Sequence, residues 1–161
     1  MAEFAKLRVG LAQINPTVGA LRENAAKILD YYNQAADAGC DVVAFPELSI
    51  TGYPPEDLVL KQGFVAENQF VLAEIVKSIG ETFAVIGFVE QGQKSGELYN
   101  AAAICQNQKV IGVYRKHLLP NYNVFDEQRY FTPGIHNPLF NIKGACIGVT
   151  ICEDIWDSQG P

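Results

Sequence analysis

The first forty-five residues hold the pattern that most restricts the fold of this chain: a strand, a helix and a second strand in succession. The segment 7–14, "LRVGLAQI", is apolar on both faces, which is typical of a strand covered on both sides. A second continuous apolar strand is expected over 41–45, "DVVAF". Between them, apolar residues recur at helical spacing up to Gly39, a residue suited to the position after a helix. These helical positions are Leu21, Ala25, Ile28, Leu29, Tyr32 and Ala36. The pattern predicts a βαβ unit.

The remaining segments predict that further strands join this unit in a mixed sheet. Helical periodicity begins after two prolines, near Glu56, is broken near Gly63 and ends at about Ile79. A third buried strand is expected over 83–89. Short polar turns then separate "LYNAAAIC" from "VIGVYRK", which is typical of antiparallel pairing. Two more strands are expected within 138–152, around a turn at Gly144, so the sequence predicts an α/β fold.

Composition limits the class of partner. The chain has 161 residues, the size of about one domain, and 48% of them are hydrophobic. The net charge is −6 and no basic run occurs, so we expect neither a nucleic acid nor a membrane as partner, but a small molecule. Four cysteines lack zinc-ligand spacing, and no leader or membrane-spanning stretch is evident. We therefore expect buried free thiols and a cytoplasmic location.

Three polar residues follow apolar strands directly, at the positions where α/β sheets collect their ligands. Glu47 follows "VVAFP", Lys116 follows "VIGVYR" and Cys152 follows "IGVTI". A cysteine nucleophile needs either a base to take its proton or a cationic neighbour that lowers the pKa of the thiol. Glu47 is a candidate for the base and Lys116 for the cation. Lys116 is also a candidate for the cation that stabilises the oxyanion formed when a thiolate adds to a carbonyl. The backbone N–H of Glu153 is a candidate for a second donor to that oxyanion.

Each of these residues also has a purely structural interpretation, which residue types alone leave open. Taken singly, a cysteine like Cys152 is more often a small core residue than a nucleophile, Lys116 is more often a solvated rim residue, and Glu47 more often a loop or capping carboxylate. A Cys–His pair would need His117 or His136 near Cys152, and no feature of the sequence places either one there. Motifs for a serine nucleophile, a phosphate loop, a dinucleotide turn or a zinc protease are absent from the sequence.

The segments around the three residues resemble a known superfamily. "FPELSITGYPPEDL", "YRKHLLPNYNVFDEQRYF" and "GVTICEDIW" are similar to the three catalytic segments of the nitrilase, or carbon–nitrogen hydrolase, superfamily, in the same order. Within it, "TGYPPEDL" and the loop after the lysine most resemble the glutamine amidotransferase domains of glutamine-dependent NAD⁺ synthetases. The resemblance implies a nitrilase-like four-layer α-β-β-α sandwich with mixed sheets, incomplete in this chain.

The same resemblance implies roles for individual residues. Glu47 would be the general base, Cys152 the nucleophile and Lys116 the group that stabilises the tetrahedral intermediate. In the long loop after the lysine, Tyr122 would contact bound glutamine, and Glu127 would orient Lys116 and the substrate amide. Glutamine would be converted to glutamate and ammonia through a thioester, without a cofactor.

The resemblance also implies a larger protein. Residues 1–161 would be the N-terminal part of the glutaminase domain. ATP and Mg²⁺ would be used only by a synthetase domain elsewhere in the same polypeptide, which would amidate nicotinic acid adenine dinucleotide. The resemblance also implies a homo-oligomer, because members of this superfamily commonly form dimers and larger assemblies. Two alternatives remain open at this point: a stand-alone amidase or carbamoylase of the same superfamily, and a truncated, inactive product or interaction module.

Overall fold

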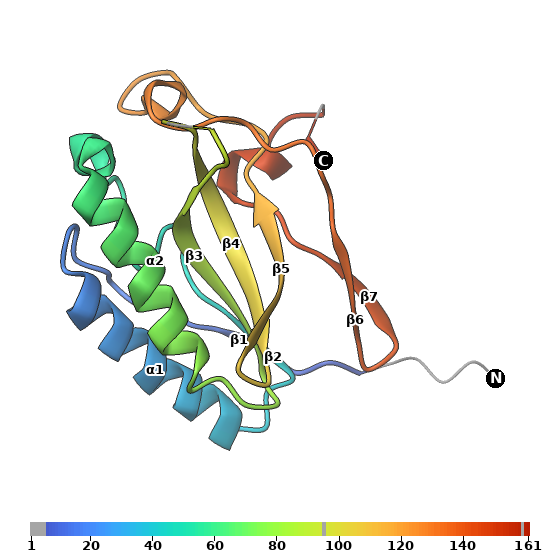
Figure 1. Cartoon of the computed structure of the whole chain (residues 1–161). Helices are drawn as coiled ribbons and strands as arrows, with labels where there is room; N and C mark the ends of the chain where they lie inside the picture. Colours follow the sequence, from blue (N-terminus) through green and yellow to red (C-terminus); the bar gives the residue numbers. More distant parts are fainter. Residues whose placement is uncertain (1–5, 95, 159) are drawn as a thin grey trace.

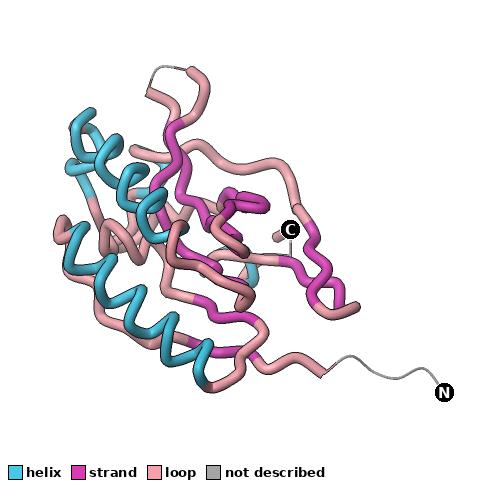
Figure 2. The backbone as a smooth tube through the Cα atoms, turned by 60° about the horizontal axis from the view of Figure 1, so that its bottom comes forward, coloured by secondary structure: helices cyan, strands magenta, loops and turns pink. Residues whose placement is uncertain are grey.

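The computed structural model describes residues 6–94, 96–158 and 160–161, which form a layered α/β structure (Figure 1). Two helices lie side by side along one face of a five-stranded sheet, and a two-stranded ribbon lies on the other side of that sheet (Figures 1 and 2). The helices are α1 (Leu21–Asp37) and α2 (Gln62–Val76). The sheet contains β1 (Val9–Leu11), β2 (Val42–Ala44), β3 (Phe83–Gln91), β4 (Leu98–Gln106) and β5 (Lys109–Arg115), and the ribbon contains β6 (Leu139–Ile142) and β7 (Ala145–Gly148). Three short 3₁₀ helices complete the structure: η1 (Glu56–Leu60), η2 (Glu127–Arg129) and η3 (Cys152–Ile155).

The sheet is mixed, as the sequence predicts. Its strand order is β1-β2-β3-β4-β5, with β1, β2 and β3 parallel and the β3–β4 and β4–β5 pairs antiparallel. The predicted βαβ unit is β1, α1 and β2. Strand β5 runs in the same direction as β2 and β3, because the β3–β4 and β4–β5 pairs are both antiparallel. The turn after β2 and the end of β5 therefore lie at the same edge of the sheet.

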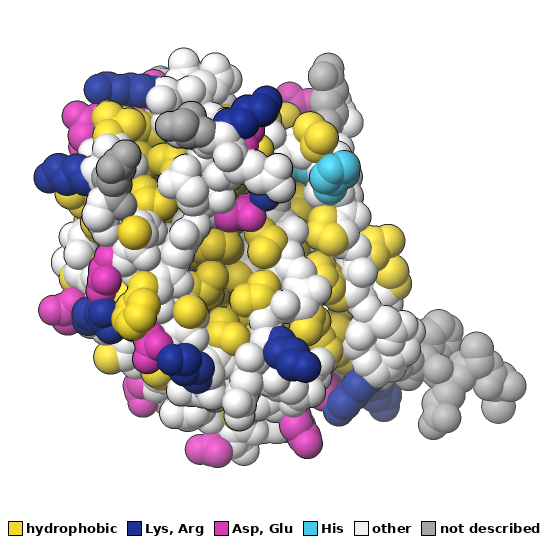
Figure 3. Space-filling view, in the orientation of Figure 1, with side chains coloured by type: hydrophobic (Ala, Val, Ile, Leu, Met, Phe, Trp, Pro, Cys, Tyr) yellow, Lys and Arg dark blue, Asp and Glu magenta, His cyan; other side chains and the backbone are white. Residues whose placement is uncertain are grey.

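The main core lies between the helices and the sheet. Ile28 and Tyr32 of α1 and Ile75 of α2 are buried against Val43 and Ile86 of the strands. An ion pair between Arg22 of α1 and Glu67 of α2 ties the exposed sides of the two helices together. The opposite face of the sheet is covered only in part, where Tyr114, Ile104 and Ile151 form a smaller cluster with Phe140 of the ribbon. The edge strand β5 exposes Val110 and Ile111, and hydrophobic side chains gather in the middle of this side of the molecule (Figure 3).

Some predicted boundaries are wrong. The strand expected to reach Cys152 ends at Gly148, which pairs with Leu139 at the start of β6. The residue before Leu139 is Pro138, which has no N–H to donate, so the ladder cannot extend past this pair. The predicted break in the second helical segment falls at Lys61, whose backbone is extended, rather than at Gly63.

The expectation of buried thiols holds for only part of the set. All four cysteines are free, and Cys105 is buried in the core, but Cys40 is only partly buried and Cys146 and Cys152 are exposed. Across the stretches that the structure describes, no helix is both long and apolar enough to span a membrane.

Candidate active site

Glu47 lies in a tight turn that follows β2. The turn rests on Gly87 of the neighbouring strand β3, where the N–H of Ile50 donates to the carbonyl oxygen of Gly87 at 3.1 Å. A Cβ atom on Gly87 would lie 2.4 Å from the backbone nitrogen of Leu48 and 2.6 Å from the carbonyl oxygen of Pro46. Only glycine permits so close an approach. The contact fixes the backbone position from which the side chain of Glu47 extends.

Lys116 is the residue directly after β5, and its side chain is fully buried. Its Nζ atom lies 2.6 Å from Oε1 of Glu47 and 2.9 Å from Oε1 of Glu127. Burial lowers the pKa of this ammonium, but the charges and hydrogen bonds of Glu47 and Glu127 outweigh burial and raise the pKa above its ordinary value. The lysine is therefore held as a cation between two carboxylates, and the interpretation of Lys116 as a solvated rim residue is wrong.

Glu127 comes from η2, in the long loop after Lys116, and is buried. Tyr53 Oη donates a hydrogen bond of 2.9 Å to the Oε1 atom of Glu127, the same oxygen that accepts from Lys116. The pKa of Glu127 is raised, first by desolvation and then by the negative charge of Glu47, whereas Lys116 acts in the opposite direction.

Asn100 of β4 also belongs to this cluster, and sequence reasoning missed it. Its Nδ2 atom donates to Oε1 of Glu47 at 2.6 Å and to Oε2 of Glu127 at 3.4 Å. Its Oδ1 atom is buried and has no hydrogen-bond partner within the part of the chain described. The available signal was a single amide inside the otherwise apolar run "LYNAAAIC", since a polar side chain in a strand that is buried throughout needs a specific partner.

Cys152 opens η3 and has a φ of 44°, a left-handed conformation that is rare for a side-chain-bearing residue. Such strain persists only where the surroundings enforce it, and it is common at functional sites. The thiol is exposed. Its pKa is raised, first by partial desolvation and then by the charge of Glu47; Glu127 and Glu153 act in the same direction and Lys116 in the opposite one.

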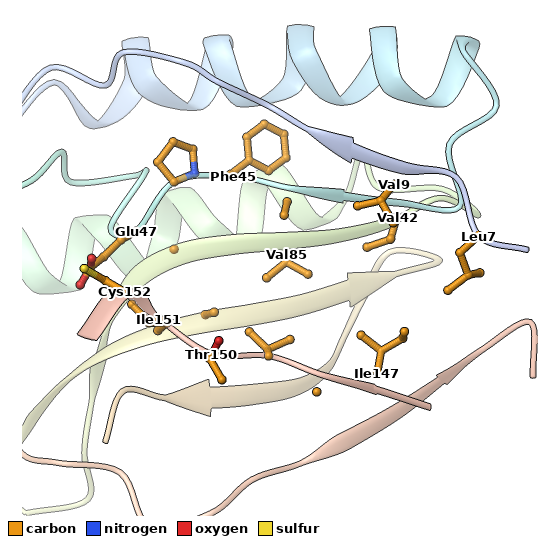
Figure 4. A pocket seen from close by; sticks show the side chains of 16 residues that line it. Leu7, Val9, Val42, Phe45, Glu47, Val85, Ile147, Thr150, Ile151 and Cys152 are labelled. Atoms are coloured by element: carbon orange, nitrogen blue, oxygen red, sulfur yellow. The ribbon is translucent and has the colours of Figure 1, made fainter. Parts of the chain in front are cut away.

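A cavity of about 370 Å³ connects Cys152 with Glu47. Most of its lining is apolar and comes from the uncovered face of the sheet and from the segment 147–152. The side chains of Glu47 and Cys152 point toward one another at one end of this cavity, and Val9, Val42 and Ile147 lie toward the other end (Figure 4). The structure therefore brings Glu47, Lys116, Glu127 and Cys152 to one place.

Tyr122 lies beside this place, with 50% of its surface exposed. Its hydroxyl donates to the carboxylate of Glu153, at 3.0 Å from Oε1 and 2.9 Å from Oε2. The ring of His117 makes other contacts: it stacks on Tyr114, with centroids 5.5 Å apart, and its Nε2 atom lies 3.3 Å from the backbone carbonyl oxygen of His136. Within 6–94, 96–158 and 160–161, His, Cys, Asp and Glu side chains form no group of three or more that could hold a metal ion.

Comparison with known proteins gives the family of this chain. Residues 8–159 match the carbon–nitrogen hydrolase family. The chain belongs to this family. A glutamine-dependent NAD(+) synthetase from Thermotoga maritima is 45% identical over 159 residues, which are 97% of this chain and 27% of that protein. One from Acinetobacter baylyi is 42% identical over 149 residues, 92% of this chain and 27% of that protein.

Solved structures give the fold of this carbon–nitrogen hydrolase chain. The structure of a glutamine-dependent NAD⁺ synthetase from Acinetobacter baumannii in complex with ADP matches 93% of this chain and 28% of that one, with a TM-score of 0.89 and 41% identity. An amidase from Nesterenkonia sp. matches with a TM-score of 0.79 at 20% identity, over 92% of this chain and 56% of that one, and shows the fold alone. The predicted nitrilase-like α/β fold is confirmed, and this chain spans little more than a quarter of the length of its synthetase relatives.

Proposed function

We propose that this chain is the N-terminal part of a glutaminase domain, and that the domain releases ammonia from glutamine for a glutamine-dependent NAD⁺ synthetase. The observation that carries the proposal is the cluster of buried Lys116 and Glu127 with half-buried Glu47, which meets an exposed thiol at Cys152 across one cavity. The relatives with 40% identity or more support the choice of glutamine over other amides. Resemblance to amidases rests on the fold alone.

The proposed reaction begins with proton transfer from Cys152 to Glu47. Lys116 and Asn100 both donate to Oε1 of Glu47, so Oε2 is the oxygen left to accept the thiol proton. The raised pKa of Cys152 keeps the thiol protonated in the resting site. The thiolate forms only when the base takes the proton, and its sulfur then attacks the side-chain amide carbon of glutamine.

Lys116 supplies the charge that the tetrahedral intermediate needs. An ammonium has three N–H donors, and Glu47 and Glu127 use two of them in the structure. The third is available to the oxyanion that forms on the amide carbonyl, together with the backbone N–H of Glu153. Glu47 then returns its proton to the leaving nitrogen, ammonia departs, and a γ-glutamyl thioester remains on Cys152.

Water completes the cycle. Glu47 removes a proton from water, the hydroxide adds to the thioester carbon, and the intermediate collapses with cleavage of the C–S bond. The proton returns to the sulfur, glutamate leaves, and the free thiol is restored. In this proposal Tyr122 and Glu127 line the path of the substrate, with Glu127 holding Lys116 in place through its 2.9 Å contact.

The larger setting is also a proposal. Because the chain spans only 27% of the length of the first two relatives, we place a synthetase domain elsewhere in the polypeptide, where ATP and Mg²⁺ would serve the amidation of nicotinic acid adenine dinucleotide. The steps assigned to the present residues use no cofactor. Free thiols at all four cysteines support our proposal of a cytoplasmic setting. We also propose a homo-oligomer, because members of the superfamily commonly form one.

The test is glutamine hydrolysis by the full-length protein, followed as glutamate and ammonia release. Cys152→Ala is expected to reduce turnover to background. Cys146→Ala is the matched control, because Cys146 is also exposed but lies on β7, outside the cluster. Loss of activity in Cys152→Ala alone supports the mechanism, and an unchanged rate in that variant overturns it. A panel of simple amides separates a glutaminase from a general amidase.

A further inference from the structure

Asp154 is a buried carboxylate two residues after the nucleophile, and the mechanism above does not use it. It lies in η3, the short helix that Cys152 begins, and only 2% of its surface is exposed. A carboxylate is seldom buried unless several donors satisfy its oxygens. The four hydrogen bonds to the Asp154 carboxylate therefore show which segments this side chain connects.

All four donors to Asp154 are uncharged. Oδ1 accepts from the backbone N–H groups of His117 at 3.1 Å and Leu118 at 2.9 Å. Oδ2 accepts from the Tyr114 hydroxyl at 2.6 Å and from the backbone N–H of Ile151 at 2.9 Å. Two oxygens thus satisfy four donors, which matches the acceptor capacity of a carboxylate and exceeds that of a carboxamide oxygen.

The positions of these donors matter more than their number. Tyr114 and His117 lie on either side of Lys116 in the chain, at the end of β5 and in the segment that follows it. Ile151 directly precedes Cys152, and Asp154 itself lies on the other side of that cysteine. One carboxylate therefore links the segment that carries the cation to the segment that carries the nucleophile.

The same contacts account for the strained backbone of Cys152. A positive φ at a non-glycine residue is a strained conformation that persists only where the surroundings fix it. The hydrogen bond from Ile151 to Asp154 closes the turn around Cys152, and the bonds from His117 and Leu118 anchor that turn to the β5 side of the sheet. Tyr114 is itself fully buried, so the anchor point cannot move freely.

We infer that Asp154 is a positioning residue, which fixes the sulfur of Cys152 relative to Lys116 and Glu47 through the hydrogen bonds to Ile151, His117, Leu118 and Tyr114. The inference rests on the proposed function in that it takes Cys152 as the nucleophile. Asp154 itself touches neither the substrate nor the reacting atoms in this scheme. Its removal should therefore act on the alignment of the thiol rather than on substrate affinity.

Two variants of the full-length protein test this, with one matched control. Asp154→Asn keeps the size of the side chain but has one acceptor oxygen, and Tyr114→Phe removes a single hydroxyl from the cluster. Tyr32→Phe is the control, because the Tyr32 hydroxyl is also nearly buried and bonded, to the N–H of Gly80 and the carbonyl of Thr82, away from Cys152. Unfolding temperature, kcat and KM for glutamine are measured for each.

If Asp154 positions the thiol, kcat in Asp154→Asn falls by about 10²-fold, the usual result of a small misplacement of a reacting group, while KM changes little. Tyr114→Phe shows a smaller fall in kcat, and Tyr32→Phe shows none, even where its unfolding temperature drops as much. A lower unfolding temperature with unchanged kcat in both Asp154→Asn and Tyr114→Phe overturns the inference. If Asp154→Asn does not fold, Tyr114→Phe decides alone.

A second measurement does not depend on glutamine. The rate of Cys152 alkylation by iodoacetamide is followed against pH by peptide mass spectrometry. In Asp154→Asn the inflection should move to lower pH, toward that of an ordinary thiol, because the sulfur is then farther from the negative charge of Glu47. An unmoved inflection counts against the inference. If the parent protein fails to hydrolyse glutamine, the proposed function fails, but this readout still tests the role of Asp154.

Discussion

The Nδ2 atom of Asn100 lies 2.6 Å from Oε1 of Glu47, so a neutral amide of β4 holds the carboxylate that faces Cys152. The same nitrogen lies 3.4 Å from Oε2 of Glu127. Asn100 thus donates to both of the carboxylates that share Lys116. A neutral donor at this position stabilises both negative charges without adding a second cation that would tie up the base.

We predict that Asn100→Asp disables the base while keeping the shape of the side chain. A third carboxylate beside Glu47 and Glu127 raises their pKa values, so the base is ionised only at higher pH. In the full-length protein the acid limb of the kcat/KM profile for glutamine should move to higher pH, and the maximum should fall by at least about tenfold.

The control for this variant is Asn24→Asp, at another buried asparagine. Its carboxamide bonds to the carbonyl oxygens of Thr17 and Ile50 in a neighbouring part of the core. Asn24→Asp should lower the unfolding temperature without moving the acid limb. Equal shifts in both variants would mean that the limb reports general destabilisation and not the base.

A second prediction concerns the buried cation. Lys116→Met removes the cation that pairs with buried Glu127 and half-buried Glu47, which typically costs about 3–5 kcal/mol of stability. It also removes an oxyanion donor, which costs about 10²–10³ in kcat. Adding Glu127→Gln removes one unpaired charge, so the double variant should regain stability but not activity. Labelling of the buried Cys105 thiol in increasing urea measures the unfolding of this domain within the full-length protein. A double variant less stable than Lys116→Met would contradict the charge argument.

The third prediction separates thiol reactivity from catalysis. The pKa of Cys152 is raised first by desolvation and then by the charge of Glu47, so Glu47→Gln should lower this pKa in part. Iodoacetamide reacts with the thiolate, and its rate with Cys152 at pH 7.5 should therefore increase, whereas glutamine turnover should fall by about 10²-fold or more because the base is lost. Glu67→Gln, at an exposed ion pair with Arg22, should change neither rate. Slower alkylation of Glu47→Gln would show that its charge does not oppose the thiolate.

The sequence predicted the central residues of the site because each of them follows an apolar strand. Glu47, Lys116 and Cys152 could be picked out as polar residues where strands stop, and the structure brings all three together. Asn100 and Asp154 could not be found in this way. Asn100 lies within a strand and Asp154 within the short helix η3. Their importance comes from partners 53 and 40 residues away, Glu47 and Tyr114 respectively.

The fold could be predicted as far as local periodicity reaches. The βαβ unit and the antiparallel strands were predicted correctly, since continuous apolar runs, helical spacing and short polar turns encode them. The early end of β7 depends on a contact between two strands: Pro138, which precedes β6, decides how far β7 can pair. Exposure of Cys146 likewise depends on which face of the ribbon meets the sheet, and a run of four strand residues does not encode that choice.

The last prediction tests how closely the backbone beneath Glu47 must pack. A Cβ atom on Gly87 would lie 2.4 Å from the nitrogen of Leu48, 2.6 Å from the oxygen of Pro46 and 2.9 Å from the carbonyl carbon of Glu47, all of them backbone atoms. Gly87→Ala must therefore displace the turn, with a cost of about 1–3 kcal/mol and a fall of about 10²-fold in kcat. Gly80→Ala is the control, because its Cβ would meet only the Tyr32 hydroxyl, at an ordinary 3.7 Å. Glutamine turnover and Cys105 labelling in urea measure both effects. Wild-type turnover in Gly87→Ala would show that the site tolerates movement of the turn that carries its base.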